Sequence, residues 1–310
     1  MSERTERHAA PLRLGTRKSL MATSQSQIVA DRLTALTGRA VELVGVTTFG
    51  DVSRAHLTQL GGTGVFVNDL RGRLLAGEVD FAVHSLKDLP TKPDERLAMA
   101  AIPKRDDPRD ALVGPVKLHD LPAGARVGTG SPRRVAQLRL LRPDLDYVPI
   151  RGNADTRIGK VTSGELDAVV LAAAGLARIR RDGEIAQVFE VDEMLPAPGQ
   201  GALAVECLAD RDDLIELLRA VDDPPTRAAV DAERSVLAAL EAGCAAPVGA
   251  FASGDGHILN LTATVVAVDG ARSVRKSTSG PSTTAVEMGR ELAAAMIAEG
   301  ADTLMGEQAR

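Results

Sequence analysis

Short apolar runs alternate with amphipathic stretches along residues 12–221, and this pattern predicts alternating strands and helices. The runs predicted as strands lie at 12–16, 41–46, 81–83, 97–102, 126–129, 146–150, 166–171 and 202–206. The stretch after the first strand predicts a helix whose buried side is made of Met21, Ile28, Val29, Leu33 and Leu36. Alternation of this kind predicts an α/β fold in which helices cover sheets.

A different pattern follows Pro224 and Pro225, which mark a boundary. It predicts a helix at 226–240, antiparallel strands at 248–252, 258–268 and 273–277, and a last helix at 284–299. Gly300 is expected to stop that helix. This part of the chain is therefore predicted to be a smaller C-terminal α+β domain.

The chain is predicted to pass between two domains and back before it enters the third. A charged, proline-bounded segment at 103–110 has the character of one crossing, and a turn-rich segment at 196–201 that of a return. We expect a disordered tail at 1–10, a first domain at 11–103 with 200–222, a second at 104–199 and a third at 223–310. Such a return is typical of two-lobed binding folds with a hinge.

Composition narrows the kinds of partner. The 310 residues include five Phe, one Tyr and no Trp, so the aromatic faces on which single-stranded nucleic acid stacks are scarce. The net charge of -5 argues against a general polyanion binder. No apolar run approaches the roughly 18 residues of a membrane span, and residues 1–10 lack the apolar core of a secretory signal. We expect no nucleic-acid or membrane partner.

Two cysteines are too few for a disulfide framework or a cysteine zinc site, so we expect a cytoplasmic protein. We also expect the protein to be a monomer. His56, His119 and His257 lack metal-ligand spacing, and no metal is predicted. Cys207 lies in an apolar run and is expected to be buried. Cys244 lies in a Gly/Ala/Pro loop, where a role in attachment or nucleophilic attack and a buried small side chain both remain open.

Polar side chains gather at the end of one predicted strand. The apolar run 81–83 is followed by His84, Ser85, Lys87 and Asp88, and Pro90 then ends regular pairing. Because ligands of open α/β sheets lie beyond the carboxyl ends of strands, this group is a candidate site. A solvated polar turn with a Lys–Asp pair is the competing interpretation.

A second candidate lies where the strand at 126–129 runs into Gly130-Ser131-Pro132-Arg133-Arg134. Ser131 suits an N-cap and Pro132 suits the first helical position, so a helix is predicted here. Two arginines in its first turn oppose the helix dipole, at a cost of about a few tenths of a kcal/mol. An anionic ligand would explain that arrangement, and two ordinary surface arginines are the alternative.

Cations recur at the ends of other predicted strands or the starts of helices, although the chain as a whole is acidic. Together with those above, the set is Arg17, Lys87, Arg133, Arg134, Arg151, Arg157 and Arg178. The rigid fork of a guanidinium suits carboxylates and phosphates. The set therefore predicts a ligand rich in one of these groups.

Five motifs occur in order and together closely resemble the porphobilinogen deaminases, also called hydroxymethylbilane synthases, of tetrapyrrole biosynthesis. They are His84-Ser85-Leu86-Lys87-Asp88-Leu89-Pro90, Gly128-Thr129-Gly130-Ser131-Pro132-Arg133-Arg134, Arg151-Gly152-Asn153 with Thr156-Arg157, Pro198-Gly199-Gln200-Gly201, and Gly243-Cys244 with Pro247-Val248-Gly249. The resemblance runs from about residue 12 to the last helix. Each motif is weak alone, but the ordered set is specific.

The resemblance implies a transferase that joins four porphobilinogen molecules head to tail with loss of ammonia and then frees hydroxymethylbilane by hydrolysis. It implies a dipyrromethane cofactor held as a thioether to Cys244. The implied architecture has two periplasmic-binding-protein-like α/β domains with a hinge, facing a cleft, and a C-terminal α+β domain that carries the cysteine.

Functional residues carry over from the family motif by motif. The catalytic aspartate falls on Asp88. Cofactor contacts fall on Ser85, Lys87, Asp88, Thr129, Ser131, Arg133, Arg134 and Arg157. Substrate contacts fall on Arg17, Ser19, Gln25, Arg151, Arg157 and Arg178.

The glycine-rich loop predicted at 47–64 departs from the family pattern. Gln59 and Thr63 stand where many members carry lysines, Phe49 replaces a commonly polar residue, and outside the loop Gly130 replaces a common serine. Electrostatic help from this loop to a growing anionic chain is therefore not predicted. The alternative function is a non-catalytic, two-lobed ligand-binding protein of the same fold, which needs neither the cysteine linkage nor the chemistry of Asp88.

Overall fold

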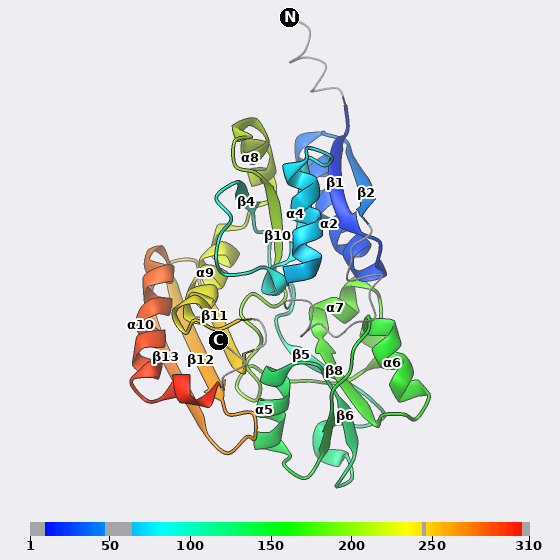
Figure 1. Cartoon of the computed structure of the whole chain (residues 1–310), viewed down its shortest axis with the longest axis vertical. Coiled ribbons are helices and arrows are strands. Elements are labelled where there is room, and N and C mark those ends of the chain that lie inside the picture. Colours follow the sequence, from blue (N-terminus) through cyan, green and yellow to red (C-terminus); the bar gives the residue numbers. More distant parts are fainter. Residues whose placement is uncertain (1–9, 47–63, 244–245, 306–310) are drawn as a thin grey trace, which may run out of the picture. The chain divides into compact units, whose positions relative to one another are not determined.

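The computed structural model of the chain describes residues 10–46, 64–243 and 246–305. The chain divides into two compact units (Figure 1): Met1–Lys104 with Leu203–Asp223, and Arg105–Ala202 with Pro224–Arg310. It therefore passes between the units after residues 104, 202 and 223. The predicted division into three domains stays a prediction, and the loop predicted at 47–64 lies outside the described residues except for Gly64.

The first unit is built on a five-stranded sheet of order β2-β1-β3-β10-β4. Its strands are β1 (Leu12–Arg17), β2 (Val41–Val46), β3 (Phe81–Ser85), β4 (Leu97–Ala101) and β10 (Leu203–Leu208). Strand β1 pairs in parallel with β2 and β3, whereas β10 runs antiparallel to β3 and β4. The carboxyl ends of β1 and β3 consequently lie on one edge of the sheet.

Helices cover both faces of this sheet. They are α2 (Leu20–Thr37), α4 (Gly64–Leu75) and α8 (Asp212–Leu218), with 3₁₀ turns η1 (Leu86–Asp88) and η4 (Arg219–Val221). Helices α2 and α8 share a core with Phe81 and Val83, whereas α4 packs with Ala82. Successive residues of β3 thus serve opposite faces, as the pleat of a strand requires.

The buried face of α2 differs from the predicted one. Its buried residues are Gln25, Ser26, Val29, Ala30 and Leu33. The prediction was wrong for Ile28 and Leu36, which are 47% and 58% exposed. The buried positions follow helical spacing, and 28 and 36 fall outside that stripe. Small and polar side chains complete the face, which a search for apolar residues alone could not show.

The second unit contains a sheet of order β7-β6-β8-β5-β9. Its strands are β5 (Asp110–Val113), β6 (Arg126–Gly128), β7 (Asp146–Val148), β8 (Ala168–Ala172) and β9 (Ile185–Val188). Its helices are α5 (Pro132–Leu141), α6 (Ala154–Thr162) and α7 (Ala173–Arg178), with turns η2 (Leu118–Asp120) and η3 (Asp182–Glu184). Strands β5 and β9 were not predicted.

The two five-stranded sheets have the same plan. In each, three parallel strands are followed by one antiparallel strand and then a fifth strand. In each sheet the antiparallel strand begins soon after the chain passes from one unit to the other. Strand β5 follows the passage after residue 104, and β10 follows the passage after residue 202. The α/β class is confirmed, and so is the return of the strand predicted at 202–206 to the first sheet, where it is observed as β10.

The last part of the second unit is α+β, as predicted. Helices α9 (Pro224–Ala239) and α10 (Ala285–Ile297) share a core with an antiparallel sheet of β11 (Val248–Gly254), β12 (Ile258–Val266) and β13 (Ser273–Pro281), with turns η5 (Ser282–Thr284) and η6 (Ala301–Leu304). Two prolines open α9 rather than precede it, because the first helical turn tolerates their missing N–H groups.

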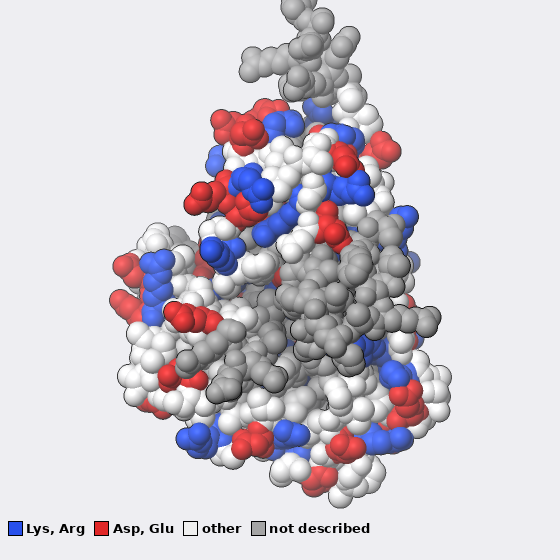
Figure 2. All heavy atoms as spheres, viewed as in Figure 1, with Lys and Arg blue, Asp and Glu red and all other residues white. Residues whose placement is uncertain are grey.

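None of the described helices is both long and apolar enough to cross a bilayer. On the face drawn in Figure 2, the basic and acidic side chains of the described residues are interspersed. Among the described residues of that face, the charges are therefore mixed and do not form the single basic patch that binds polyanions.

A buried ion cluster joins three elements of the first unit. Glu206 on β10 accepts hydrogen bonds from Arg71 Nε at 3.0 Å and Nη2 at 2.7 Å. His84 on β3 places Nε2 3.4 Å from Glu206 Oε2, and both side chains are 4% exposed. Burial raises the pKa of Glu206, but the interactions with nearby His84 and the hydrogen bonds from Arg71 outweigh burial and lower it to about 2. The cluster thus ties β3 to β10 and α4.

This pKa shift predicts acid sensitivity. The pKa of Glu206 falls from 4.5 to about 2 on folding, so its stabilisation is complete above pH ~4.5 and is lost as the pH falls toward 2, by about 3 kcal/mol in all. Urea titrations of the free energy of unfolding between pH 5 and 2 should show a smaller loss in Glu206→Gln than in the unaltered chain. The control Glu216→Gln, at an exposed ion pair with Arg219, should keep the full loss. An unchanged pH dependence in Glu206→Gln would contradict this assignment.

Candidate functional site

The carboxyl end of β3 presents three of the predicted site residues. Ser85 is the last residue of β3, and Lys87 and Asp88 lie in the η1 turn. Leu86 and Leu89 are buried, whereas Asp88 is exposed. The turn is therefore anchored by its leucines, and the Asp88 carboxylate is accessible to a ligand.

The end of β1 lies on the same edge, because β1 and β3 are parallel neighbours. Arg17 is the last residue of β1. Ser19 caps α2, and its hydroxyl accepts a hydrogen bond from the Ala22 N–H at 3.3 Å. Gln25 is on the buried side of α2. The first unit thus brings Arg17 and Ser19 to the edge that carries Asp88.

In the second unit, β6 leads into α5 as the sequence predicted. Thr129 is buried, and its hydroxyl accepts a hydrogen bond from the Ser131 N–H at 3.3 Å. Ser131 takes the N-cap position and Pro132 the start of the helix, but the Ser131 side chain makes no capping hydrogen bond. The Ser131 hydroxyl is therefore not used to cap the helix.

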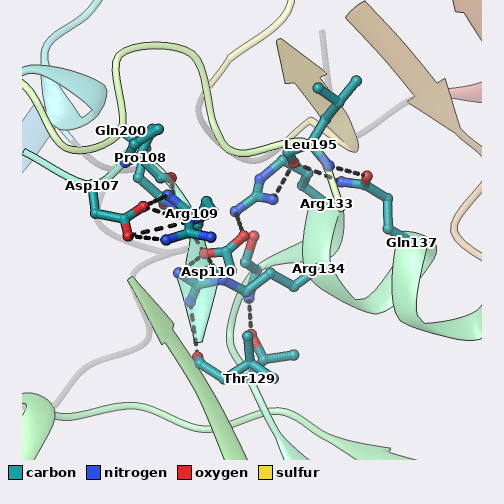
Figure 3. A network of polar contacts seen from close by, with 12 residues as sticks. Asp107, Pro108, Arg109, Asp110, Thr129, Arg133, Arg134, Gln137, Leu195 and Gln200 are labelled. Carbon is teal, nitrogen blue, oxygen red and sulfur yellow. Dashed lines mark hydrogen bonds and ion pairs between the residues drawn. The ribbon is translucent and has the colours of Figure 1, made fainter. Parts of the chain in front are cut away.

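Arg133 and Arg134 are buried and share the carboxylate of Asp110 (Figure 3). Arg133 Nη2 lies 2.8 Å from Asp110 Oδ2. Arg134 donates to Asp110 Oδ1 from Nε at 3.0 Å and from Nη2 at 2.7 Å. Gln200 Nε2 donates to the same oxygen at 2.9 Å. The alternative of two ordinary surface arginines is wrong, because Arg133 and Arg134 are only 3% and 6% exposed.

Backbone carbonyls hold the outer ends of the two guanidiniums. Arg133 Nη1 donates to the Leu195 carbonyl at 2.6 Å, and Arg134 Nη1 donates to the Val170 carbonyl at 2.9 Å. Gln137, one turn further along α5, donates to the same Leu195 carbonyl at 3.0 Å and accepts from the Leu195 N–H at 2.8 Å (Figure 3). Both arginines are therefore held in one orientation.

This cluster contains more positive than negative charge. Burial raises the pKa of Asp110, but attraction to Arg133 and Arg134 outweighs burial and holds that pKa well below its usual range. The three ionised side chains then sum to a charge of +1. In addition, Arg133 Nε and Asp110 Oδ2 are both buried without a hydrogen-bond partner among the described residues. Because buried charges are normally paired, the cluster lacks an anion that a ligand carboxylate could supply.

The remaining predicted arginines of this unit differ in their surroundings. Arg151 is exposed beyond β7. Arg157, in the first turn of α6, donates from Nε to the Gly152 carbonyl at 2.9 Å. Arg178 ends α7 and pairs with Asp106 at 2.7 Å. Arg178 is thus held by the chain's own carboxylate, which the sequence pattern did not predict.

Glu233 is a further buried carboxylate that the sequence analysis missed. Its side chain on α9 is fully buried and accepts hydrogen bonds from Arg105 Nη1 at 2.6 Å and Nη2 at 3.0 Å. It also accepts from the N–H groups of Gly199 at 2.7 Å and Ala252 at 2.8 Å. Asp110 and Glu233 were missed because each is satisfied by residues distant in sequence. The one available signal was an acidic residue opening or interrupting an apolar segment.

The chain has two cysteines, Cys207 and Cys244. Cys207 is buried on β10, as predicted, and burial raises its pKa to about 11, which makes it a poor nucleophile. Cys244 lies outside the described residues. Among the described residues, no group of three or more His, Cys, Asp and Glu side chains is arranged to hold a metal ion.

Two family models match the chain. One is described as "Porphobilinogen deaminase, dipyromethane cofactor binding domain" and matches residues 12–216. The other is described as "Porphobilinogen deaminase, C-terminal domain" and matches residues 228–298.

Individual proteins agree with these models. A porphobilinogen deaminase of Thermobifida fusca is 62% identical over 96% of this chain and 97% of its own length. Porphobilinogen deaminase 1 of Streptomyces coelicolor is 60% identical over 96% of this chain and 98% of its own length. Among solved structures, a periplasmic substrate-binding protein of an ABC transporter from Coxiella burnetii is 14% identical, over 70% of this chain and 94% of that one, with a TM-score of 0.44, a similarity too weak to bear on function.

The buried arginine pair, the ordered motifs and near full-length relatives thus lead to one conclusion. The chain belongs to the porphobilinogen deaminase family and carries that family's dipyrromethane cofactor binding domain and its C-terminal domain.

Proposed function

We propose that this chain is a transferase that condenses four porphobilinogen molecules head to tail, releases ammonia at each step and finally frees hydroxymethylbilane by hydrolysis. The observation that carries this proposal is the buried Arg133–Arg134 pair, which shares one carboxylate and retains a surplus positive charge. Pyrroles that bear acetate and propionate groups are the kind of ligand such a pair binds. Membership of the family supplies the reaction.

The residues of the second unit fit the dipyrromethane cofactor. Arg133 Nε is a buried donor without a hydrogen-bond partner among the described residues, and the Ser131 hydroxyl is not used in capping. Both are donors that suit a cofactor carboxylate. The proposed cofactor-holding set is Cys244, through a thioether, with Ser85, Lys87, Asp88, Thr129, Ser131, Arg133, Arg134 and Arg157. When bound, the cofactor supplies the pyrrole to which the first substrate is joined.

The proposed substrate-binding set answers the charge of the substrate. Each porphobilinogen adds two carboxylates, so four additions demand many cations in a chain whose net charge is -5. The proposed residues are Arg17, Ser19, Gln25, Arg151, Arg157 and Arg178. Exposure of Arg151 and placement of Arg17 and Ser19 at the edge that carries Asp88 support this assignment.

Asp88 is proposed as the catalytic residue. Loss of ammonia from the aminomethyl group of porphobilinogen leaves a cationic methylene-pyrrolenine. A carboxylate about 4 Å away stabilises a unit positive charge by roughly 4 kcal/mol at an effective dielectric constant near 20. Asp88 can also accept hydrogen bonds from pyrrole N–H groups and assist proton transfer to the departing amine. Its exposure on an anchored turn supports this role.

Two further features belong to the proposal. We propose a cytoplasmic location, supported by the chain having two cysteines, one of them a buried free thiol. We propose a monomer, which sedimentation of the purified chain would test. The alternative of a non-catalytic ligand-binding protein is not favoured, because the near full-length relatives are porphobilinogen deaminases.

One prediction of the proposed function concerns Asp88. The Asp88→Asn variant should fold and keep its covalent cofactor but consume porphobilinogen about 10²- to 10⁴-fold more slowly, because it loses a charge and a proton acceptor. Single-turnover assays of ammonia release measure this. The control Asp94→Asn, at a carboxylate paired with Arg96, should turn over normally. Near-normal turnover in Asp88→Asn would remove this residue from the mechanism.

A further prediction concerns Cys244. Intact-mass measurement of the purified chain should show an increment of two linked pyrrole units, and the Cys244→Ser variant should lack it because a serine hydroxyl, which stays protonated at neutral pH, is a far weaker nucleophile than a thiolate. Cys207→Ser changes the buried cysteine and should retain the increment. A covalent dipyrrole on the Cys244→Ser chain would refute this attachment site.

A further inference from the structure

Arg178 joins two segments that the chain uses to pass between its units. The outgoing segment is Arg105–Arg109, and the return segment is Pro198–Ala202. Arg178 Nε donates to Asp106 Oδ2 at 2.8 Å, and its Nη2 lies 2.7 Å from the same oxygen. The same Nη2 donates to the Gly201 carbonyl at 2.6 Å. One edge of the guanidinium therefore touches both segments.

The backbones of the two segments complete this arrangement. The Asp106 N–H donates to the Gly201 carbonyl at 3.2 Å. Gly201 has φ +86, and a Cβ placed there would lie 2.7 Å from the Asp106 carbonyl oxygen and 3.1 Å from that of Asp107. Only glycine permits so close an approach. The Gly201 carbonyl is thereby fixed where both the Asp106 N–H and Arg178 can reach it.

The Nη1 group of Arg178 makes no hydrogen bond to the described residues. The Arg178 side chain is 5% exposed, whereas that of Asp106 is 50% exposed. The structure gives Arg178 Nη1 no hydrogen-bond partner among the described residues. With Nε and Nη2 held by Asp106 and Gly201, the Nη1 donors remain for a ligand carboxylate.

We propose that Asp106 is a positioning residue for substrate binding, which holds Arg178 by its Nε and Nη2 edge so that Nη1 is set for a porphobilinogen carboxylate. This inference rests on the proposed function, in which Arg178 binds substrate. Asp106 acts through Arg178 and does not touch substrate itself. Two results follow: Asp106 affects KM rather than kcat, and its effect disappears when Arg178 cannot bind a carboxylate.

Asp107 provides a matched control. It is the adjacent aspartate, its side chain is 36% exposed, and it pairs with Arg109 at 2.8 Å rather than with Arg178. Asp107→Asn therefore removes the same charge, one residue away, without releasing Arg178. Because Asp106 is half exposed, Asp106→Asn is expected to fold.

The experiment compares Asp106→Asn, Asp107→Asn, Arg178→Gln and Asp106→Asn/Arg178→Gln, each as the full chain with its covalent cofactor verified by intact mass. We expect Asp106→Asn to raise KM for porphobilinogen about tenfold with kcat within about twofold, since a charge-assisted hydrogen bond is lost. Asp107→Asn should leave both constants unchanged. In the Arg178→Gln background, Asp106→Asn should change KM no further.

Three results would overturn the inference. The KM of Asp106→Asn could be unchanged, or it could be lowered, which would mean that Asp106 competes with substrate. The third is that Asp106→Asn raises KM equally in the unaltered chain and in the Arg178→Gln background. Failure of the proposed function can be told apart from failure of this inference. If the unaltered chain lacks the cofactor mass and does not consume porphobilinogen, the proposed function is overturned, and the role of Asp106 falls with it before any variant is compared.

Discussion

Two guanidiniums share one buried carboxylate at the start of α5, and the proposed ligand site of the second unit depends on that arrangement. Taking an ion out of water costs several kcal/mol, a cost that only close pairing offsets. Asp110 provides the pairing for both Arg133 and Arg134 and fixes their orientation. Since one anion cannot neutralise two cations, the same geometry also leaves the pair ready for an anionic ligand.

The arginine pair is connected to the segments that lead between the units. Asp110 opens β5, directly after the outgoing segment, and Gln200 of the return segment donates to its carboxylate. The guanidinium of Arg105, on the outgoing segment, is bound by Glu233 of α9 and donates to the Gln200 carbonyl at 2.8 Å. The segments and the arginine pair are therefore parts of one buried polar network, in which a change at one residue is felt by the others.

The sequence predicted elements with strong local signals. The strand–helix start at 126–134 was predicted because Ser131 and Pro132 mark a helix start, and Cys207 was predicted to be buried because its neighbours are apolar. Burial of Arg133 and Arg134 could not be predicted in this way. Their partner Asp110 comes from a four-residue strand, and its role depends on long-range packing.

Two other predicted site residues, His84 and Arg178, also have partners in the structure that the sequence did not predict. His84 was grouped with the polar residues of a strand end, yet it contacts Glu206 on a strand more than a hundred residues later. Arg178 was assigned to a ligand alone, although Asp106 holds one edge of its guanidinium. In both cases the side chain's chemistry was visible in the sequence, but its partner was not. The roles of Asp88 and Cys244 come from the family's motifs and remain proposals.

The coupling between Asp110 and Arg134 can be measured directly with a double-mutant cycle, using the free energy of unfolding of the full chain from urea titrations. Asp110→Asn and Arg134→Gln should each destabilise the chain by about 3 kcal/mol, because each leaves buried charge with less compensation. The double variant should lose about 2 kcal/mol less than the sum of the two single losses. Strictly additive losses would contradict the claim that this carboxylate holds the arginine pair.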